Sequence, residues 1–405
     1  MNPKQRETLG RMAEEVRREL TGNILPFWLK TADPDRGGFY GQITGCGELR
    51  PDAPRASVLN MRLLWTFAAA YRVLGDPALR EAAQRAKQYI ERHFMDPQYG
   101  GVYWSVDARG EALDTKKQIY SQGFAIYGMS EYYRATGDTS ALECAKALFE
   151  SVEEHAYDGV AGGYWEALGR DWSEIGDVRL SDKDANERKS MNTHLHILEP
   201  YTNLYRVWKE PRLAARIREL IEIFCTRIVD PHTGHFNLFF GDDWEVRSSA
   251  FSYGHDIEGS WLLHEAALEL GDEALLRRVE PVVRRLAEAA AEGLQEDGSI
   301  ICEHDPKRGT TDRDRHWWPQ AESVIGYLNL FQHFGDDEAL QRSEAAWRYI
   351  DDKIIDHQGG EWFWSIRADG TPNRDDDKAG PWKCSYHNSR MCLEVIERTE
   401  KMCGL

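Results

Sequence analysis

The chain has 405 residues, of which 41% are apolar and 11% aromatic, and its formal charge is −18 at pH 7. Nucleic acids and anionic membranes bind clustered Lys and Arg, so this charge argues against both as partners. The N-terminal segment MNPKQRETLGRMAEEVRREL is charged and has no apolar stretch like that of a secretory signal. No run of 18 apolar residues predicts a membrane span.

The seven cysteines are scattered at positions 46, 144, 225, 302, 384, 392 and 403. Their number is odd, and no two of them form a C-x-x-C pair. This pattern predicts free thiols in a reducing compartment rather than a disulfide framework. We therefore expect a cytoplasmic protein.

A short signal recurs six times along the chain: a turn rich in Asp, Pro and Gly, an aromatic-rich strand and a second turn. The copies read DPDRGGFYGQITGCGEL from Asp33, DPQYGGVYWSVDARGEAL from Asp96, DGVAGGYWEALGRDW from Asp158, DPHTGHFNLFFGDDW from Asp230, and, more faintly, EDGSIICEHDPKRG from Glu296 and DHQGGEWFWSIRADG from Asp356. Their glycines are spaced by roughly 60–70 residues, which indicates a repeated unit.

Two helical segments lie between successive copies. After the first copy, PRASVLNMRLLWTFAAAYRVLG ends at Gly75 and DPALREAAQRAKQYIERHF begins at Asp76. A glycine followed by an aspartate is typical of one helix ending and the next beginning. The pattern predicts a helix at about 4–30, helix pairs near 56–94, 117–156, 190–228, 254–293 and 317–355, and a last helix near 383–402.

The first helix of each pair is apolar around most of its circumference, as in MRLLWTFAAAYRVL, whereas the second is amphipathic, as in LRRVEPVVRRLAEAA. This contrast predicts an inner ring of buried helices and an outer ring of half-exposed ones. We expect an all-α fold, an (α/α)6 barrel of twelve helices with short β-hairpins at the active-site mouth. It forms one domain over residues 1–405, and an open solenoid is the alternative.

Each predicted hairpin leads into the N-terminal end of an inner helix, so these six ends meet at one mouth of the barrel. Polar and aromatic residues gather there in otherwise apolar helices: Arg62, Tyr120, Asn192, His194, His196, His255, Glu258, Trp317, Trp318, Glu322, Trp382 and His387. Their convergence from all six repeats predicts a functional site.

Helical spacing sorts these candidates. Asn192 and His196 are four residues apart and share a face, whereas His194 points away and is expected to be structural. The helix N-terminus favours the neutral imidazole, while a carboxylate such as Glu258 favours the charged one and can hold one tautomer. The balance predicts imidazoles that titrate near neutral pH.

A metal or phosphate site is not expected. On a helix, His194 and His196 diverge, and the sequence contains neither an H-E-x-x-H motif nor a glycine-rich phosphate loop. We therefore predict neither a metal nor a cofactor. Trp317, Trp318 and Trp382 present flat aromatic faces at the mouth, which suit stacking against sugar rings.

These residues lie in segments that resemble the N-acylglucosamine 2-epimerase superfamily, and within it the bacterial cellobiose 2-epimerases. The segments are APRASVLNMRLLWTFAAAYR, SMNTHLHILEPY, GHDIEGSWLL, DRHWWPQAE, GGEWFW and YHNSRMCLE. The resemblance implies an (α/α)6 barrel that needs neither metal nor nucleotide. It also implies that His255 and His387 form the acid/base pair and that His196 polarises the aldehyde oxygen.

The same resemblance implies sugar-positioning or supporting roles for Arg62, Asn192, Glu258, Trp318 and Trp382. Tyr120, Trp317 and Glu322 join them because they lie at the predicted mouth. The substrate-binding set expected here is Arg62, Tyr120, Asn192, Glu258, Trp317, Trp318, Glu322 and Trp382. The tryptophans favour a disaccharide substrate. The expected reaction is reversible epimerisation at carbon 2 of the reducing-end glucose of cellobiose or lactose, through ring opening and a cis-enediol.

Other functions stay open at this point. A mannose 2-epimerase or an aldose–ketose isomerase would use the same enediol. An inverting glycoside hydrolase would need two carboxyls, for which Glu258, Glu322 and Asp184 are candidates. A non-catalytic sugar-binding protein would keep the tryptophans without needing three histidines. The expected partner is a small sugar, and the expected state is a monomer or weak dimer.

Overall fold

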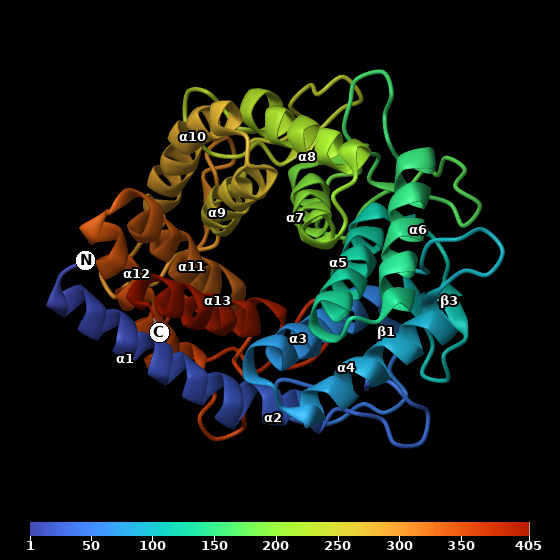
Figure 1. Ribbon diagram of the computed structural model, residues 1–405, viewed down its shortest axis with the longest axis horizontal. Helices are drawn as coiled ribbons and strands as arrows, with labels where there is room; N and C mark the ends of the chain where they lie inside the picture. Colours follow the sequence, from blue (N-terminus) through green and yellow to red (C-terminus); the bar gives the residue numbers. More distant parts are fainter. Residues whose placement is uncertain (405) are drawn as a thin grey trace.

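The computed structural model describes residues 1–404, which form twelve continuous helices in two concentric rings (Figure 1). The inner ring consists of α3 (Ser57–Leu74), α5 (Ile119–Thr136), α7 (Met191–Val207), α9 (Tyr253–Leu270), α11 (Trp317–Phe334) and α13 (Tyr386–Cys403). The outer ring consists of α1 (Pro3–Glu19) with α2 (Leu25–Leu29), α4 (Pro77–Tyr89), α6 (Thr139–His155), α8 (Pro211–Ile223), α10 (Glu273–Ala291) and α12 (Asp337–Tyr349).

The apolar character of each helix decides its ring, as expected. In α3 every residue from Ser57 to Ala70 is buried, whereas in α10 the buried residues follow one face. Gly75 ends α3 with a φ of 73°, and the carboxylate of Asp76 then accepts the backbone N–H of Ala78 to begin α4. The predicted boundary between paired helices is thereby confirmed.

Several outer helices change to a π-helical turn at the end that leads to the next turn motif. These turns are Leu20–Ile24, which joins α1 to α2, and Ile90–Phe94, Phe224–Ile228 and Ile350–Ile354, which end α4, α8 and α12. Each therefore stands near the same end of the barrel.

The six recurring turns are short hairpins, as the repeat predicted. Each is closed by a single antiparallel bridge: Ala32 with Phe39, Met95 with Val102, Tyr157 with Tyr164, Val229 with Phe236, Leu294 with Ile300, and Ile355 with Trp362. The aromatic-rich segments predicted longer hairpin strands than the structure contains. Most of the backbone pairing outside the single bridge is with the neighbouring unit.

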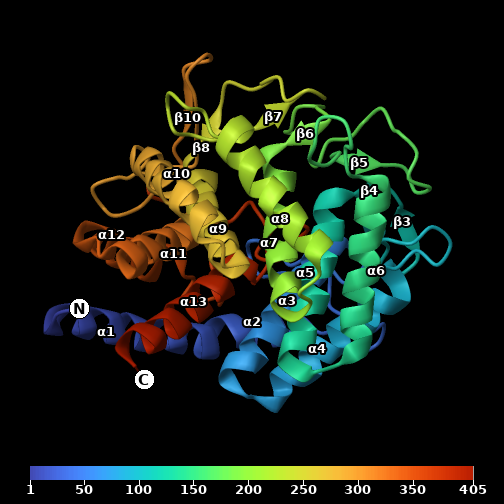
Figure 2. The same cartoon turned by 45° about the horizontal axis from the view of Figure 1, so that its top comes forward.

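Small antiparallel sheets result, in the orders β1-β2-β3, β4-β5, β6-β7, β10-β9-β8 and β11-β12. In each sheet one pair joins consecutive units, whereas β2–β3 and β9–β10 pair within a unit. The strands are β1 (Arg55–Ala56), β2 (Ser105–Val106), β3 (Ala112–Asp114), β4 (Lys117–Gln118), β5 (Ala167–Leu168), β6 (Lys189–Ser190), β7 (Phe239–Phe240), β8 (Phe251–Ser252), β9 (Glu303–Asp305), β10 (Thr310–Asp312), β11 (Arg315–His316) and β12 (Ser365–Ile366). Figure 2 shows the labelled strands gathered at one end of the barrel.

The ring is closed, which excludes the open solenoid. Helix α13 packs against both α1 and α3, so the last unit contacts the first (Figure 1). A bridge between Ile43 and Ala379 joins the same two units at the strand-bearing end.

Buried ion pairs fix the start of several inner helices relative to the preceding turn. Lys117 lies two residues before α5, and its Nζ contacts Asp96 at 3.0 Å. Lys189 precedes α7 in the same way and contacts Asp158 at 2.6 Å. The N-terminal ends of the inner helices are thus rigidly placed around one opening, which we call the active mouth. Among the described residues, no helix is long and apolar enough to cross a bilayer.

Candidate active site

A cavity of about 190 Å³ lies at the active mouth. Its lining comes from all six inner helices and the segments that precede them: Arg62, Tyr120, Asn192, His196, His255, Glu258, His316, Trp317, Trp318, Trp364, Trp382 and His387. Every residue of the predicted catalytic and substrate-binding sets is therefore placed around one opening except Glu322.

Glu322 was predicted to contact the substrate, but it does not line the cavity. Its side chain is fully buried behind the cavity, where Oε1 accepts from Nδ1 of His387 at 2.7 Å and Oε2 accepts from Trp261 Nε1 at 3.0 Å. Glu322 is four residues after Trp318 and shares its helix face. One turn farther along α11, however, that face already lies below the cavity floor.

Glu322 therefore supports His387. Burial raises the pKa of Glu322, and the hydrogen bonds from Arg390 and Trp261 oppose that rise by favouring the ionised form. The ionised carboxylate only accepts hydrogen bonds, so with it the neutral His387 ring carries its proton on Nδ1 and leaves the Nε2 lone pair free. Arg390, one turn beyond His387 on α13, donates from Nη2 to Glu322 at 2.6 Å and to Glu258 at 2.6 Å. Glu322 thus orients the His387 ring, and Arg390 in turn fixes the position of Glu322.

His196 is supported in the same manner. Its Nδ1 contacts Oε2 of Glu199 at 3.0 Å, and Glu199 also accepts from Tyr386 and Arg390. Burial alone would raise the pKa of Glu199, but Arg390 and His196 outweigh burial and lower this pKa to about 2. Glu199 is therefore ionised, so neutral His196 also has its proton on Nδ1 and a free Nε2 lone pair.

His255 differs in its support. Its Nδ1 contacts the hydroxyl of Ser252 at 2.9 Å, not the carboxylate of Glu258 three residues later on α9. The expectation that Glu258 holds the ring next to it is therefore wrong, because Glu258 extends toward Arg390. A serine hydroxyl can donate or accept, so it leaves both tautomers of His255 accessible.

The three cavity imidazoles share one property. Among the described residues, Nε2 of His196, His255 and His387 has no hydrogen-bond partner. His194 is the contrast: its Nδ1 contacts the Ser190 carbonyl at 2.7 Å and its Nε2 accepts from the Tyr164 N–H at 2.9 Å. Both of its nitrogens are used, in agreement with the structural role predicted for it.

Burial dominates the protonation of these rings. It lowers the pKa of His255 to about 3 and lowers the pKa values of His196 and His387. The prediction of imidazoles that titrate near neutral pH underestimated this cost, because a sequence shows neighbouring charges but not the depth at which a ring lies. In the free protein all three rings are neutral at pH 7.

The pKa of Glu258 is raised, whereas the pKa values of the three histidines are lowered. Burial, together with the nearby Glu322 carboxylate, raises its pKa above the usual value. Its Oε1 accepts from Arg390, whereas Oε2 is buried without a partner. A protonated Glu258 can therefore donate a hydrogen bond into the cavity.

Arg62 is a buried cation that forms no ion pair with any described carboxylate. Its side chain is 2% exposed, one Nη donates to the Tyr120 hydroxyl at 2.7 Å, and Nε has no partner. The aromatic rings of Phe124 and Tyr386 lie 4.3 and 4.7 Å from its guanidinium carbon. A buried charge without a counter-charge is costly, and such a group is suited to a ligand that becomes negative.

Aromatic side chains form the rim of the cavity. The ring centroid of Trp318 lies 4.6 Å from that of His255, and Trp382 lies 6.0 Å from Tyr120 and 5.9 Å from Trp104. His316 and Trp364 also line the cavity but were missed from sequence. His316 lies in the segment that carries Trp317 and Trp318, and Trp364 ends the segment GGEWFW, but the β11–β12 pairing that places them at the cavity is not visible in a sequence.

One cluster at the cavity contains ligand types that metals use. Oxygen and nitrogen atoms of Glu258, Glu322 and His387 lie within 4.8 Å of one another. The Arg390 guanidinium already donates to both carboxylates, so a cation occupies the position where these oxygens converge. The donor set therefore serves Arg390 rather than a metal ion.

The chain was compared with protein families, with relatives and with solved structures, and all three comparisons found matches over most of its length. A family model described as N-acylglucosamine 2-epimerase (GlcNAc 2-epimerase) matches residues 38–390. A cellobiose 2-epimerase from Bacteroides fragilis is 57% identical over 386 residues, covering 95% of this chain and 98% of the relative. The solved structure of cellobiose 2-epimerase from Spirochaeta thermophila superposes with a TM-score of 0.94 at 38% identity, covering 99% of this chain and all of that one.

Proposed function

The chain belongs to the N-acylglucosamine 2-epimerase family and is a carbohydrate epimerase, and from that premise we propose its substrate and mechanism. It inverts carbon 2 of the reducing-end glucose of β-1,4 disaccharides such as cellobiose. The observation that carries this proposal is the convergence of three imidazoles, each supported at Nδ1 and free at Nε2, on one cavity.

His387 is the base in this mechanism. Its proton sits on Nδ1, so Nε2 is ready to take the hydrogen beside the aldehyde once the sugar ring has opened. The imidazolium that forms gains the negative charge of Glu322 as its counter-charge. Arg390 keeps that carboxylate in position without competing for the proton.

Arg62 stabilises the oxyanion. Removing the carbon 2 proton puts negative charge on the carbonyl oxygen, and Arg62 is the cavity cation that lacks a counter-charge. His196 can donate to that oxygen only as an imidazolium, because Glu199 holds its single neutral-state proton on Nδ1. Arg62 donates at any working pH, and a preorganised donor of this kind contributes about 10²–10³-fold.

His255 returns the proton to the opposite face of the cis-enediol. Ring opening supplies the proton: with Nδ1 donating to the Ser252 hydroxyl, Nε2 of neutral His255 takes the proton of the carbon 1 hydroxyl while protonated Glu258 donates to the ring oxygen. The His255 imidazolium then gives its Nε2 proton to carbon 2 and becomes neutral. On ring closure the His387 imidazolium returns its proton to the carbon 1 oxygen and Glu258 recovers its own. In the reverse reaction the two histidines exchange roles. A cofactor has no step to perform in this sequence.

The cavity and its rim offer contacts to two sugar units, the reacting one and the next. Asn192 Oδ1, Glu258 Oε2 and Arg62 Nε are buried and lack partners, so the hydroxyls of the reacting sugar would complete their hydrogen bonds. Trp382, packed against Trp104 beside the cavity, offers an apolar face to the next glucose.

Glycoside hydrolysis finds less support. Inverting hydrolases use two carboxyls about 6.5–9.5 Å apart across the cleft. Among the described residues that line the cavity, Glu258 is the one carboxylic acid, and it is tied to Arg390.

The test is incubation of the enzyme with cellobiose in deuterated water, followed by NMR of the reducing sugar. We expect glucosyl-mannose with deuterium at carbon 2. A ketose product would instead identify an aldose–ketose isomerase, and release of free glucose would identify a hydrolase.

Two substitutions assign the bases. His255→Phe and His387→Phe should each lower carbon 2 exchange by about 10²–10⁴-fold. His232→Phe, at an exposed position in the fourth turn, is the matched control and should exchange at the wild-type rate. Wild-type exchange in either cavity variant would refute the acid/base pair.

A further inference from the structure

Three side chains with metal-binding chemistry meet beside the active mouth, outside the catalytic cluster. They are Cys302, which precedes β9, Asp312, which ends β10, and His316 on β11. One ligand atom from each lies within 4.8 Å of the other two. A thiolate, a carboxylate and an imidazole are all ligands of Zn²⁺, and three protein ligands leave its fourth position to water.

The backbone holds these residues together. The N–H of Cys302 donates to the Asp312 carbonyl at 3.1 Å, and β9 pairs along its length with β10. His316 then contacts Asp312, with Nε2 3.2 Å from Oδ2. The ligand positions therefore lie on paired strands rather than on a free loop.

The surrounding charge favours a cation. Two further acids lie beside the three side chains: Glu303 is paired with Asp312 across β9 and β10, and Asp314 lies two residues after Asp312. Among the described residues, the sulfur of Cys302 makes no hydrogen bond, so no existing contact has to be broken when a metal replaces its proton.

We propose that Cys302, Asp312 and His316 bind a divalent ion of zinc type, and that the bound ion inhibits the enzyme. On binding, the thiol releases one proton and a sulfur–metal bond forms, with no change of oxidation state. Tetrahedral coordination places ligand atoms about 3.5 Å from one another, and the present atoms lie within 4.8 Å, with the His316–Asp312 pair at 3.2 Å. We call this three-residue group the rim site.

Inhibition follows from where the rim site is attached. His316 lines the catalytic cavity and immediately precedes Trp317, so pulling its ring toward Cys302 changes the cavity wall. On the other side, the Tyr253 N–H donates to the Cys302 carbonyl, and Ser252 pairs with Glu303. Ser252 is the residue whose hydroxyl supports His255, so the segment that leads into that histidine is tied to the rim site.

Binding is tested first without any reaction. Metal-free protein is titrated with Co²⁺, whose thiolate charge-transfer and tetrahedral ligand-field absorptions report the ligand set. We expect one equivalent per chain with a thiolate band, displaced by Zn²⁺. Cys302→Ser should lose the band and bind at least about 100-fold more weakly, since even outer contacts of a metal site are worth about 10–100-fold.

The matched control is Cys46→Ser, which removes an exposed thiol away from the rim site. It should titrate like the wild type. One equivalent of Co²⁺ without a thiolate band, or an unchanged spectrum in Cys302→Ser, would overturn the rim site.

The inhibitory part rests on the proposed function and has its own measurement. One to two equivalents of Zn²⁺ should lower the rate of cellobiose epimerisation at least about tenfold in the wild type and Cys46→Ser, and EDTA should restore it. Cys302→Ser should work at the wild-type rate with or without Zn²⁺. Equal inhibition of Cys302→Ser would place the ion elsewhere and refute the proposal. Full activity with the metal bound would refute inhibition alone.

If cellobiose is not a substrate, the rate measurement fails, but the Co²⁺ titration still decides whether the rim site exists. The two failures are therefore distinguishable.

Discussion

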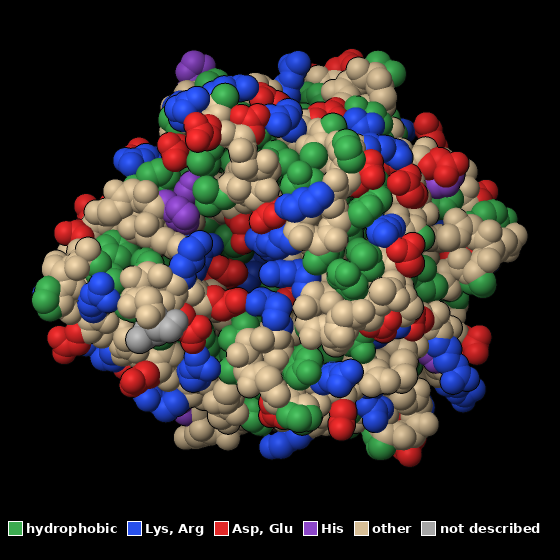
Figure 3. Space-filling view, viewed as in Figure 1, with side chains coloured by type: hydrophobic (Ala, Val, Ile, Leu, Met, Phe, Trp, Pro, Cys, Tyr) green, Lys and Arg blue, Asp and Glu red, His purple; other side chains and the backbone are tan. Residues whose placement is uncertain are grey.

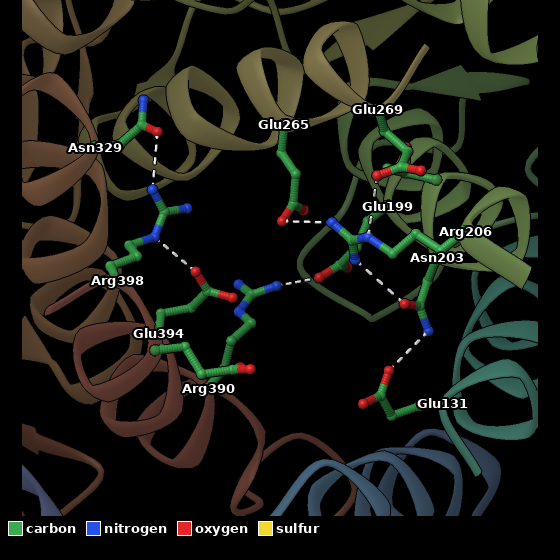
Figure 4. Close-up of polar contacts among 12 residues, drawn as sticks. Glu131, Glu199, Asn203, Arg206, Glu265, Glu269, Asn329, Arg390, Glu394 and Arg398 are labelled. Carbon is green, nitrogen blue, oxygen red and sulfur yellow. Dashed lines mark hydrogen bonds and ion pairs between the residues drawn. The ribbon is translucent and has the colours of Figure 1, made fainter. Parts of the chain in front are cut away.

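The two ends of the barrel use the same six inner helices in opposite ways. At the active mouth, where these helices begin, polar atoms face a cavity without partners. At the other end, which we call the far mouth, a larger cavity of about 520 Å³ is bordered by charged side chains (Figure 3). Nearly all of these side chains are paired with one another (Figure 4).

The pairs at the far mouth connect each inner helix to the next. The contacts are Arg72 with Glu131 and with Glu397, Arg134 with Asn203, Arg206 with Glu265, His264 with Asn329, and Asn329 with Arg398. Every junction of the inner ring is thus bridged by at least one polar contact.

The difference separates two tasks. Polar groups that satisfy one another stabilise the ring, whereas polar groups left without partners cost stability and are kept where a ligand completes them. Substitutions of the same chemical kind should therefore affect the reaction at one mouth and the fold at the other.

The largest effect is expected from Glu322→Gln at the active mouth. The amide carries no charge, so the imidazolium formed on His387 loses its counter-charge. We expect kcat to fall about 10²–10⁴-fold. Glu265→Gln makes the same chemical change at the far mouth and should leave kcat within about twofold of the wild type. Similar kcat values for the two variants would abolish the distinction between the mouths.

Replacing either of two buried arginines should change the free energy of unfolding in opposite directions. Arg62→Met removes a cation that has no counter-charge, so we expect kcat to fall about 10²–10³-fold while the free energy of unfolding rises by about 1–2 kcal/mol. Arg390→Met instead leaves Glu199, Glu258 and Glu322 without their shared cation. That change should lower the free energy of unfolding by about 3–5 kcal/mol.

Urea denaturation of both variants measures these changes. A loss of stability in Arg62→Met comparable to that in Arg390→Met would mean that Arg62 contributes to the fold rather than only to the reaction.

A smaller effect is expected at the far mouth itself. Arg206 contacts Glu265 at 2.7 Å and Glu269 at 3.6 Å, and its side chain is 22% exposed. Arg206→Met should lower the free energy of unfolding by about 1 kcal/mol at low salt. The difference should shrink in 1 M salt, where the screening length is about 3 Å. A salt-independent loss, or a tenfold loss of kcat, would contradict the assignment of this end to stability.

The sequence predicts the fold because it repeats. Six copies of one turn, with an apolar and an amphipathic helix between them, leave few arrangements other than a closed double ring. The same repeat locates the active mouth, since each turn leads into an inner helix. Closure through α1 and α13 then brings Arg62 and His387 together from distant parts of the chain.

The supporting contacts were beyond the reach of the sequence. Glu199 follows His196 by three residues and Arg390 follows His387 by three, so each shares a face with its histidine. Helical spacing alone does not say that Arg390 joins Glu199 to Glu258 and Glu322, which come from three other helices. Spacing likewise does not show that Glu258 extends to Arg390 rather than to His255.

The sequence also does not show how deeply the cavity histidines are buried. Their burial lowers their pKa values, and from this follows the prediction with the smallest expected change. A group with a lowered pKa keeps its base form until the pH falls through that lowered value; burial holds the pKa of His387, the base for cellobiose, well below the ordinary imidazole value and lowers that of His255 to about 3. The values of kcat/KM for cellobiose should therefore vary by less than about twofold between pH 7.5 and 5.5, because this parameter reports the free enzyme. A base with the ordinary imidazole pKa of about 6.5 would instead lose about tenfold over that range. Initial rates at low cellobiose concentration distinguish the two cases, and an acid limb centred near pH 6.5 would show that the cavity is far wetter than its burial indicates.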